Sequence, residues 1–295
     1  LHMPTGSGKT RTAINVMCNL LRENSKEFVV VWLANKEELC DQAFTEFEKA
    51  WQILGNQKIK IFKHFGGEKS NLVKINKYCE DNVAVIFSSL DMMYEDVTRN
   101  ISSVLNLSHK IGFVIMDEAH LTIAKTYKTI IEILASKEKT SILGMSATPG
   151  RSYRDVSQDL ELKNFYHGNK VSLKIGKSKD IIKWLVQNKY LAKAKIEKIN
   201  YEADLAKLFT VQELNNEIER INSGKDYSKK FRDKISNDNE RLELTLDLIK
   251  SESKTNEKII VFASSMPNAI AIGDFLNIEG IKAATITSKT DPIIR

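Results

Sequence analysis

Short, unbroken runs of apolar residues recur along the first half of the chain and predict β-strands. These runs are rich in β-branched side chains and cover residues 28–34, 83–89, 112–120 and 140–149. A strand that is apolar on both faces is typical of a parallel sheet, because helices cover both faces of such a sheet. The pattern therefore predicts parallel strands with helical connections between them.

The segments between these runs have apolar residues at three- and four-residue spacing, which predicts helices with one apolar face. The apolar faces comprise Ala13, Met17 and Leu20 in the first segment, Ala43, Phe47 and Trp51 in the second, and Ala124, Tyr127, Ile131 and Leu134 in the third. Because strands and helices alternate, the expected fold class is α/β with a doubly wound parallel sheet.

Three parts are expected along the chain. Residues 1–150 form the sheet domain, residues 151–257 form a linking and mostly helical charged insert, and residues 258–295 begin a second, incomplete pattern of strand, helix and strand. Within the insert, residues 180–191 predict an amphipathic helix. Residues 224–240 contain few apolar side chains and predict a loop or an insertion, since such a segment buries little surface.

Composition and charge narrow this picture only slightly. The 295 residues are 42% hydrophobic and 28% charged, which is ordinary for a globular protein. The net charge of +6 favours a polyanionic partner but does not require one. The three cysteines are far apart and indicate reduced thiols, and no apolar run is long enough to span a bilayer. We therefore expect a cytoplasmic protein without a membrane partner.

The opening sequence "LHMPTGSGKT" predicts a loop that binds phosphate. Its glycines allow the backbone to turn tightly and approach phosphate oxygens, Lys9 would neutralise the β and γ phosphates, and the Thr10 hydroxyl would coordinate Mg²⁺. The helix that begins there directs its positive end at the same anions. The residues expected to bind ATP are Pro4, Thr5, Gly6, Ser7, Gly8, Lys9 and Thr10.

The opening loop departs from the general pattern at one position, because Met3 stands where a glycine is usual. The alternative interpretation is an ordinary turn into a helix that happens to contain these residues. The chain also opens inside the motif and not at a methionine. We therefore expect it to be a piece of a longer protein.

A second motif, "VIMDEAH", ends the third apolar run with two carboxylates, Asp117 and Glu118. Ligands of open parallel sheets bind at the carboxyl edge, where the loop around Lys9 is also expected. There Asp117 would hold Mg²⁺ through water, and Glu118 would orient or deprotonate the attacking water. The alternative is a strand end followed by the acidic start of a helix. Because a phosphate loop precedes this motif, we expect Lys9, Asp117 and Glu118 to be the catalytic residues.

The motifs "MPTGSGKT", "DEAH" and "MSATPGR", in this order and spacing, resemble motifs I, II and III of superfamily 2 helicases. Within that superfamily, the chain resembles the motor subunits of type I and type III restriction enzymes. The segments "LANKEELCDQAFTEF", "FSSLDMM" and "IIVFASSMPNAIAIGDFL" resemble motifs Ia, Ib and IV. The resemblance implies a P-loop NTPase with a RecA-like first lobe, a partial second RecA-like lobe, and ATP held between them. It also implies that adenine recognition and the arginine fingers lie outside the chain.

The same resemblance implies roles for polar residues that follow the strands. Ser146, Ala147 and Thr148 would couple the nucleotide site to nucleic acid, with His120 as the contact between motifs II and III. Alternatively, the serine and threonine only cap the turn before Pro149. Nucleic acid would be held chiefly through its phosphates, so binding would tolerate different sequences and weaken with salt. The candidate contacts, each explained equally well as an ordinary polar surface residue, are Asn35, Lys36, Ser88, Ser89, Arg151, Ser264 and Thr287.

The expected function is that of an ATP-dependent helicase or translocase that uses Mg²⁺ and acts on DNA. The resemblance to restriction enzymes favours DNA over RNA and implies a role in restriction or anti-phage defence, with a nuclease or specificity subunit as partner. Two alternatives stay open, namely an RNA helicase and a nucleotide-switched scaffold that does not translocate. Comparing ATPase stimulation by duplex DNA, single-stranded DNA and RNA would separate them.

Overall fold

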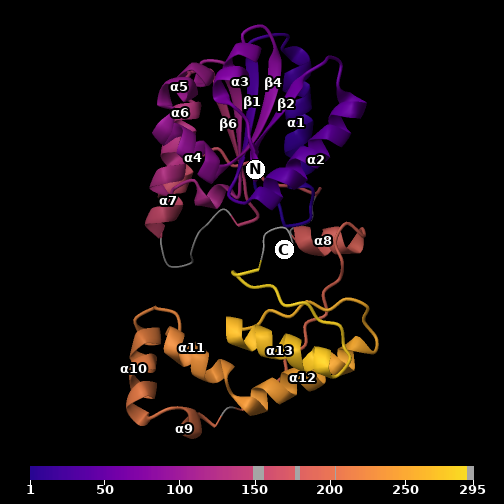
Figure 1. The fold of residues 1–295 in the computed structure, drawn as a ribbon, viewed down its shortest axis with the longest axis vertical. Helices are drawn as coiled ribbons and strands as arrows, with labels where there is room; N and C mark the ends of the chain where they lie inside the picture. The colour runs from indigo at the N-terminus through magenta and orange to yellow at the C-terminus, as the bar shows by residue number, and fades with distance from the viewer. Residues whose placement is uncertain (149–155, 177–179, 203, 291–295) are drawn as a thin grey trace. The chain divides into compact units, whose positions relative to one another are not determined.

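A six-stranded sheet lies at the centre of the first half of the chain (Figure 1). The structure, a computed structural model, describes residues 1–148, 156–176, 180–202 and 204–290. Each neighbouring pair of strands in this sheet is parallel except β2 and β3, which form a short antiparallel pair. In spatial order the strands are β3 (Glu68–Lys69), β2 (Lys60–Phe65), β4 (Val83–Ser89), β1 (Phe28–Ala34), β5 (Ile111–Asp117) and β6 (Ser141–Met145).

Helices cover both faces of this sheet, as the apolar runs predict. On one face lie α1 (Lys9–Glu23) and α2 (Glu37–Leu54), and on the other lie α3 (Leu72–Tyr78), α4 (Leu90–Arg99), α5 (Ile101–Ser108) and α6 (Lys125–Leu134) (Figure 1). The apolar run of β1 is unbroken because both faces of the strand are buried. Val29, Val31 and Leu33 pack on the side of α3 to α6, whereas Val30 and Trp32 pack against α1 and α2. Each fully buried side chain of this size contributes about 1.5–3 kcal/mol. The predicted doubly wound α/β sheet is confirmed.

The first three residues extend the sheet beyond β6. Ser146 N donates to Leu1 O at 3.1 Å, and His2 N donates to Val171 O at 2.7 Å. His2 thus forms parallel bridges with Ser146 on one side and with Ser172 on the other. Because β6 runs parallel to β5 and pairs Met145 with Asp117, the loop that follows residue 3 starts at the carboxyl edge of the sheet.

The first compact unit of the structure spans Leu1–Ala194 and includes two helices beyond the sheet, α7 (Val156–Phe165) and α8 (Ile181–Gln187). Helix α7 packs on the α6 side, where Lys128 Nζ lies 3.1 Å from Glu161 Oε1. Just after α7, the Tyr166 hydroxyl lies 2.9 Å from the Thr122 hydroxyl. These contacts explain why the compact unit continues past residue 150. The division into lobes at residues 150 and 257 stays a prediction.

The second compact unit spans Lys195–Arg295 and contains helices in its described part. These are α9 (Leu205–Leu208), α10 (Val211–Asn222), α11 (Lys229–Ser236), α12 (Asn239–Ser253) and α13 (Met266–Ile278). A small apolar cluster of Leu246, Ile249, Ile272 and Leu276 joins α12 to α13. None of the helices in the described part of the chain is both long and apolar enough to cross a membrane.

Helix α11 lies inside the segment 224–240, so the loop predicted there is wrong, whereas the alternative of an insertion stays a prediction. The ring of Phe231 stacks on Phe209 with centroids 4.6 Å apart, and on Tyr227 at 5.0 Å. The Glu213 carboxylate accepts hydrogen bonds from Lys234 and pairs with Lys230, and these contacts lower the pKa of Glu213 to about 2. A few aromatic contacts and a shared carboxylate therefore hold a helix that apolar content alone does not indicate.

The strands expected within 258–295 are absent from the described residues, although the helix between them forms as α13. A strand needs a neighbour that satisfies its backbone groups. After α13, a side chain satisfies backbone groups that a neighbouring strand would otherwise satisfy. The Asn277 amide accepts from the N–H of Ala283 and donates to its carbonyl, each at 3.0 Å. The segment before α13 leaves Phe262 94% exposed. The second RecA-like lobe therefore stays a prediction.

The three cysteines are free and buried in the first unit. Burial raises the pKa of Cys40 to about 12 and that of Cys79 to about 11, and it also raises the pKa of Cys18. Because the thiolate is the reactive form, we expect iodoacetamide to alkylate none of the three at pH 8 within the time that labels all three in denaturant. Mass spectrometry of the intact chain measures this. Native labelling at the denatured rate would contradict the buried positions.

Candidate active site

The opening loop has the backbone geometry that its glycines predict. Gly6 and Gly8 adopt φ angles of 74° and 96°, in the left-handed region that side chains disfavour. Gly8 is the residue before α1, and no side chain in the described structure caps this helix or places an acid in its first turn. A Cβ built on Gly8 would meet nothing within 4 Å. The first N–H groups of α1 therefore lack a side-chain cap, which leaves them available to an anion.

Lys9 folds back into the curve of this loop. Its Nζ donates to Met3 O at 3.2 Å and to Pro4 O at 3.3 Å, so the ammonium lies where it could meet phosphate oxygens. Thr10 follows in the first turn of α1 and is half-buried. Met3 is 6% exposed, and its N–H donates to Ser146 O at 3.4 Å. The departure from glycine at this position is explained, because Met3 is the paired and buried end of the segment that precedes the loop.

The two acids of the second motif lie at the end of β5. Asp117 is the last residue of the strand, and Glu118 follows with a φ of 51°, which is uncommon for a residue other than glycine. Glu118 N donates to Asp117 Oδ1 at 2.9 Å. Burial raises the pKa of the Asp117 carboxyl, while this hydrogen bond and the nearby Lys9 ammonium lower it. The structure thus brings Lys9 and Asp117 within electrostatic reach at one edge of the sheet.

A line of polar contacts leads from Glu118 to the residues after β6. His120 Nδ1 lies 3.3 Å from Glu118 Oε2 and 3.3 Å from Ser146 Oγ. Ser146 Oγ in turn accepts from Thr148 N at 3.1 Å. The structure therefore contains the expected contact between His120 and Ser146, while the coupling role of these residues stays a prediction.

The site also contains a residue that sequence reasoning missed. His2 Nε2 lies 3.1 Å from Ala147 O, and His2 Nδ1 lies 3.4 Å from Ser172 Oγ. The imidazole thus links the start of the opening loop to the residues after β6. No pattern in the sequence indicates this position, because the contact depends on the pairing of residues that are far apart along the chain.

The candidate nucleic-acid contacts of the first unit gather at the carboxyl ends of two neighbouring strands. Asn35 and Lys36 follow β1, and Lys36 is exposed. Ser88 and Ser89 end β4 and are buried, with Ser88 Oγ donating to Ser89 O and Ser89 Oγ accepting from Met92 N. The two serine side chains are thus engaged within the protein. Their role as contacts stays a prediction, as does that of Asn35 and Lys36.

The remaining candidate contacts lie elsewhere. Ser264 Oγ is 2.9 Å from Ser236 Oγ, and Thr287 Oγ1 is 3.4 Å from Thr290 Oγ1, both within the second unit. Arg151 lies outside the residues that the structure describes. The roles of these three residues as nucleic-acid contacts stay predictions from sequence.

The donor set fits Mg²⁺ better than a metal that needs a protein cage. Within the described ranges, no group of three or more histidine, cysteine or acidic side chains could hold a metal ion. Thr10 and Asp117 offer one hydroxyl and one carboxylate. Mg²⁺ is usually held by one or two protein oxygens together with substrate phosphates and water, and this pair matches that habit.

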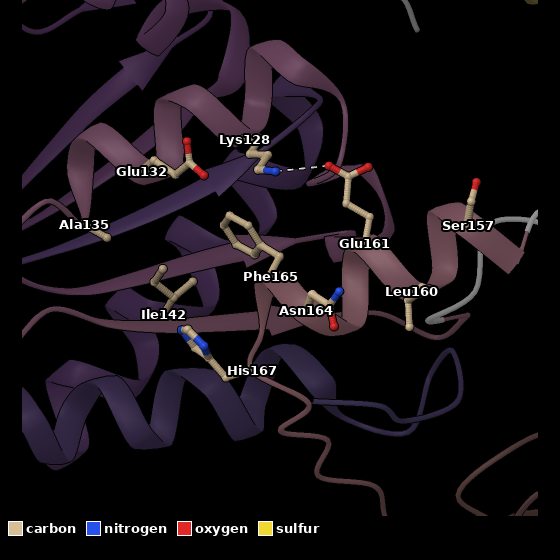
Figure 2. Close-up of a pocket in the computed structure, with 10 residues that line it drawn as sticks. All are labelled: Lys128, Glu132, Ala135, Ile142, Ser157, Leu160, Glu161, Asn164, Phe165 and His167. Atoms are coloured by element: carbon tan, nitrogen blue, oxygen red, sulfur yellow. Dashed lines mark hydrogen bonds and ion pairs between the residues drawn. The ribbon is translucent and has the colours of Figure 1, made fainter.

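A cavity of about 670 Å³ lies apart from these residues, between α6, β6 and α7 (Figure 2). Figure 2 shows the Phe165 ring and the Lys128–Glu161 ion pair on its walls, which belong to α6 and α7. No residue predicted for the active site lines it. We therefore assign it no part in the chemistry at the carboxyl edge.

Comparison with known proteins adds a family to this geometry. Residues 1–151 match the family model described as type III restriction enzyme, res subunit. A protein of Saccharomyces cerevisiae named "Putative ATP-dependent helicase IRC3" is 22% identical over 304 residues, which cover 99% of this chain and 38% of IRC3. The ATP-dependent DNA helicase fml1 of Schizosaccharomyces pombe is 26% identical over 188 residues, which cover 62% of this chain and 20% of fml1. The chain thus spans less than two fifths of either relative.

Among solved structures, the Hef helicase domain of Pyrococcus furiosus matches with a TM-score of 0.44 and 16% sequence identity. The match covers 95% of this chain and 49% of that one. The family match and the doubly wound sheet with its opening glycine loop together give the first unit a RecA-like P-loop NTPase fold.

Proposed function

Because the chain belongs to the family of type III restriction enzyme res subunits, we propose that it is the ATP-hydrolysing part of a helicase or translocase that acts on DNA. The observation that carries this proposal is the convergence at the carboxyl edge of the sheet. The Lys9 ammonium lowers the pKa of the Asp117 carboxyl. His120 contacts both the Glu118 carboxylate and the Ser146 hydroxyl. Helicase relatives that use ATP support the enzyme class, and the DNA helicase fml1 supports DNA as the polymer.

Each residue of this edge has a distinct task in the proposed reaction. The N–H groups of the loop and the first turn of α1 bind the triphosphate, and Lys9 neutralises its terminal phosphates. Thr10 and Asp117 hold Mg²⁺, which when bound neutralises charge on the phosphate oxygens. Glu118 orients the attacking water and accepts its proton. Pro4, Thr5, Gly6, Ser7 and Gly8 form the loop around the phosphates.

The contacts of His120 and Ser146 suggest how ATP hydrolysis is coupled to the binding of nucleic acid. A change at the Glu118 carboxylate alters the position of His120, and with it Ser146 and the backbone of Ala147 and Thr148. The ends of β1 and β4, which carry Lys36 and the other candidate contacts of the first unit, lie at the same edge of the sheet. The binding of nucleic acid at these strand ends, through its phosphates, would therefore depend on whether ATP or its hydrolysis product is bound.

The family also suggests a setting for this activity. Restriction enzymes combine a motor with nuclease and specificity functions, so we propose a nuclease or specificity subunit as partner and a role in restriction or defence. An RNA helicase and a nucleotide-switched scaffold remain the alternatives, and the stimulation experiment below distinguishes them.

The test is ATP hydrolysis by the protein that carries these residues, with duplex DNA, single-stranded DNA or RNA added. We expect DNA to stimulate hydrolysis, and added salt to reduce the stimulation because phosphate contacts release counterions. Lys9→Ala should lower the stimulated rate about a hundredfold, since it removes one preorganised donor to the developing charge. Lys26→Ala, at an exposed lysine outside the loop, is the matched control. Stimulation by RNA alone would favour the RNA helicase, and indifference to every polymer would favour the scaffold.

A further inference from the structure

A second cavity, of about 830 Å³, adjoins the phosphate loop within the first compact unit. Pro4 and Thr5 of the loop form part of its lining. Ile181 and Ile182, at the start of α8, and Leu191, just after this helix, form another part. The loop and α8 therefore enclose one space, although well over a hundred residues separate them along the chain.

The position of Leu191 is set by a tight turn at the end of α8. Lys189 adopts a φ of 64°, and the N–H groups of Tyr190 and Leu191 both donate to Leu185 O, at 2.9 and 3.2 Å. The rings of Trp184 and Tyr190 stack with centroids 5.7 Å apart. The turn therefore holds Leu191 in one place by backbone bonds and by ring stacking.

Leu191 reaches the phosphate loop itself. A Cβ built on Gly6 would lie 3.0 Å from Leu191 Cδ2, which is tighter than nine in ten real contacts of a Cβ atom. The φ of 74° favours glycine at this position, and the absence of a Cβ there leaves room for the close approach of Leu191. The wall of the cavity and the wall of the phosphate site are continuous at this residue.

The chemistry of the cavity suits a largely apolar ligand with a few polar groups. Ile182 is 59% exposed, an unusual position for an isoleucine that lines a hollow beside a charged site. Ligand pockets combine apolar walls with a few polar groups. Here the polar residues that line the cavity beside the isoleucines are His2, Thr5, Thr148, Ser172 and Asp180. A nucleobase has this character, with apolar faces and polar edges.

We propose that this cavity takes the base and ribose of the nucleotide whose phosphates the loop binds, with Ile181, Ile182 and Leu191 packing on the base. The inference rests on the proposed function, because it requires a nucleoside triphosphate at the loop. The sequence alone places adenine recognition outside the chain. In this structure a segment that follows the sheet, 180–191, provides the apolar wall for the base.

The experiment compares two ligands that differ only by the nucleoside. Binding of ATP and of inorganic tripolyphosphate, both with Mg²⁺, is measured by calorimetry on the 295-residue chain. The variants are Ile182→Ser and Leu191→Ala, with Ile53→Ser on α2 as a control at an isoleucine that is 83% exposed and does not line the cavity. Circular dichroism verifies that each variant folds.

We expect Ile182→Ser and Leu191→Ala each to weaken ATP binding about tenfold, the typical effect of lost apolar contact in a pocket. Tripolyphosphate binding should not change in either variant, and Ile53→Ser should change neither ligand. ATP affinity that is unchanged or increased, or an equal loss for both ligands, would overturn the inference.

A different pattern of binding results would contradict the proposed function. Lys9→Ala should weaken both ligands, because the loop binds the phosphates that they share. If the unaltered chain bound neither ligand, the ATPase proposal would fall and the inference with it. If the chain bound both with equal affinity, the phosphate site would stand and the inference about the base would be wrong.

Discussion

Replacing Glu118 with glutamine is expected to lower the rate of ATP hydrolysis by about a hundredfold to ten-thousandfold, the usual contribution of a positioned general base. Glutamine keeps the size of the side chain and one oxygen, but it cannot accept a proton from water. The backbone at this position has a φ of 51°, which the substitution leaves as it is. ATP binding should change little, because the loop and Lys9 hold the phosphates.

Single-turnover hydrolysis measures this effect separately from ATP binding, which calorimetry reports. Glu48→Gln, at an exposed carboxylate on α2, makes the same chemical change away from the edge of the sheet and should leave the rate unaltered. A Glu118→Gln protein that hydrolyses ATP at the original rate would remove Glu118 from the mechanism. A loss of ATP binding equal to the loss of rate would assign it to binding instead.

Replacing Asp96 with alanine is expected to lower the free energy of unfolding by about 2 kcal/mol, within the range for a buried polar group that loses its partner. His64 Nε2, on β2, lies 2.9 Å from Asp96 Oδ2, on α4, and the two side chains are 0% and 2% exposed. Burial lowers the pKa of His64, although the Asp96 carboxylate raises it. The substitution would leave a buried imidazole without this partner, while Lys69, 3.8 Å from Asp96 Oδ1, could turn to solvent.

Urea unfolding followed by tryptophan fluorescence measures this loss. Asp91→Ala, at an exposed acid of the same helix, should cost less than about 0.5 kcal/mol. The double variant His64→Leu with Asp96→Leu should lose less than Asp96→Ala, because it leaves no buried imidazole without a partner, and the exposed Asn100 amide that donates to Asp96 Oδ1 can bind water instead. Equal stability of Asp96→Ala and the unaltered chain would show that the pair contributes nothing.

The same histidine gives the stability a pH dependence with a definite sign. A folded-state pKa below the unfolded value of 6.5 means that the unfolded chain binds the proton more readily. The contribution of neutral His64 is therefore present above pH 6.5 and is lost as the pH falls below it. His64→Gln should flatten this part of the stability profile.

Much of the fold could be predicted because its signal is local. The runs at 28–34 and 83–89 coincide with β1 and β4 (Phe28–Ala34 and Val83–Ser89), since a strand buried on both faces has no polar position to interrupt it. The opening loop could be predicted as well, because glycine spacing reports a backbone that must turn at those residues. Asp117 could be assigned to the end of a strand by the same argument.

Other features could not be predicted, because their signal is not local. The stacking of Phe209 on Phe231 creates α11 within a segment of low apolar content. The expected strand after α13 instead bonds to Asn277 through Ala283. In both cases the local structure depends on one or two specific contacts, which the average composition of a segment does not indicate.

The sequence by itself determined a doubly wound sheet, the loop around Lys9 and the acids at the end of β5, because periodicity and glycine spacing act over a few residues. Only the tertiary structure decided that His64 faces Asp96, that His2 contacts Ala147, and that Leu191 lies against Gly6. The physical reason is that each of these contacts joins segments that only the packing of the whole unit brings together. Spacing along the chain does not predict such contacts.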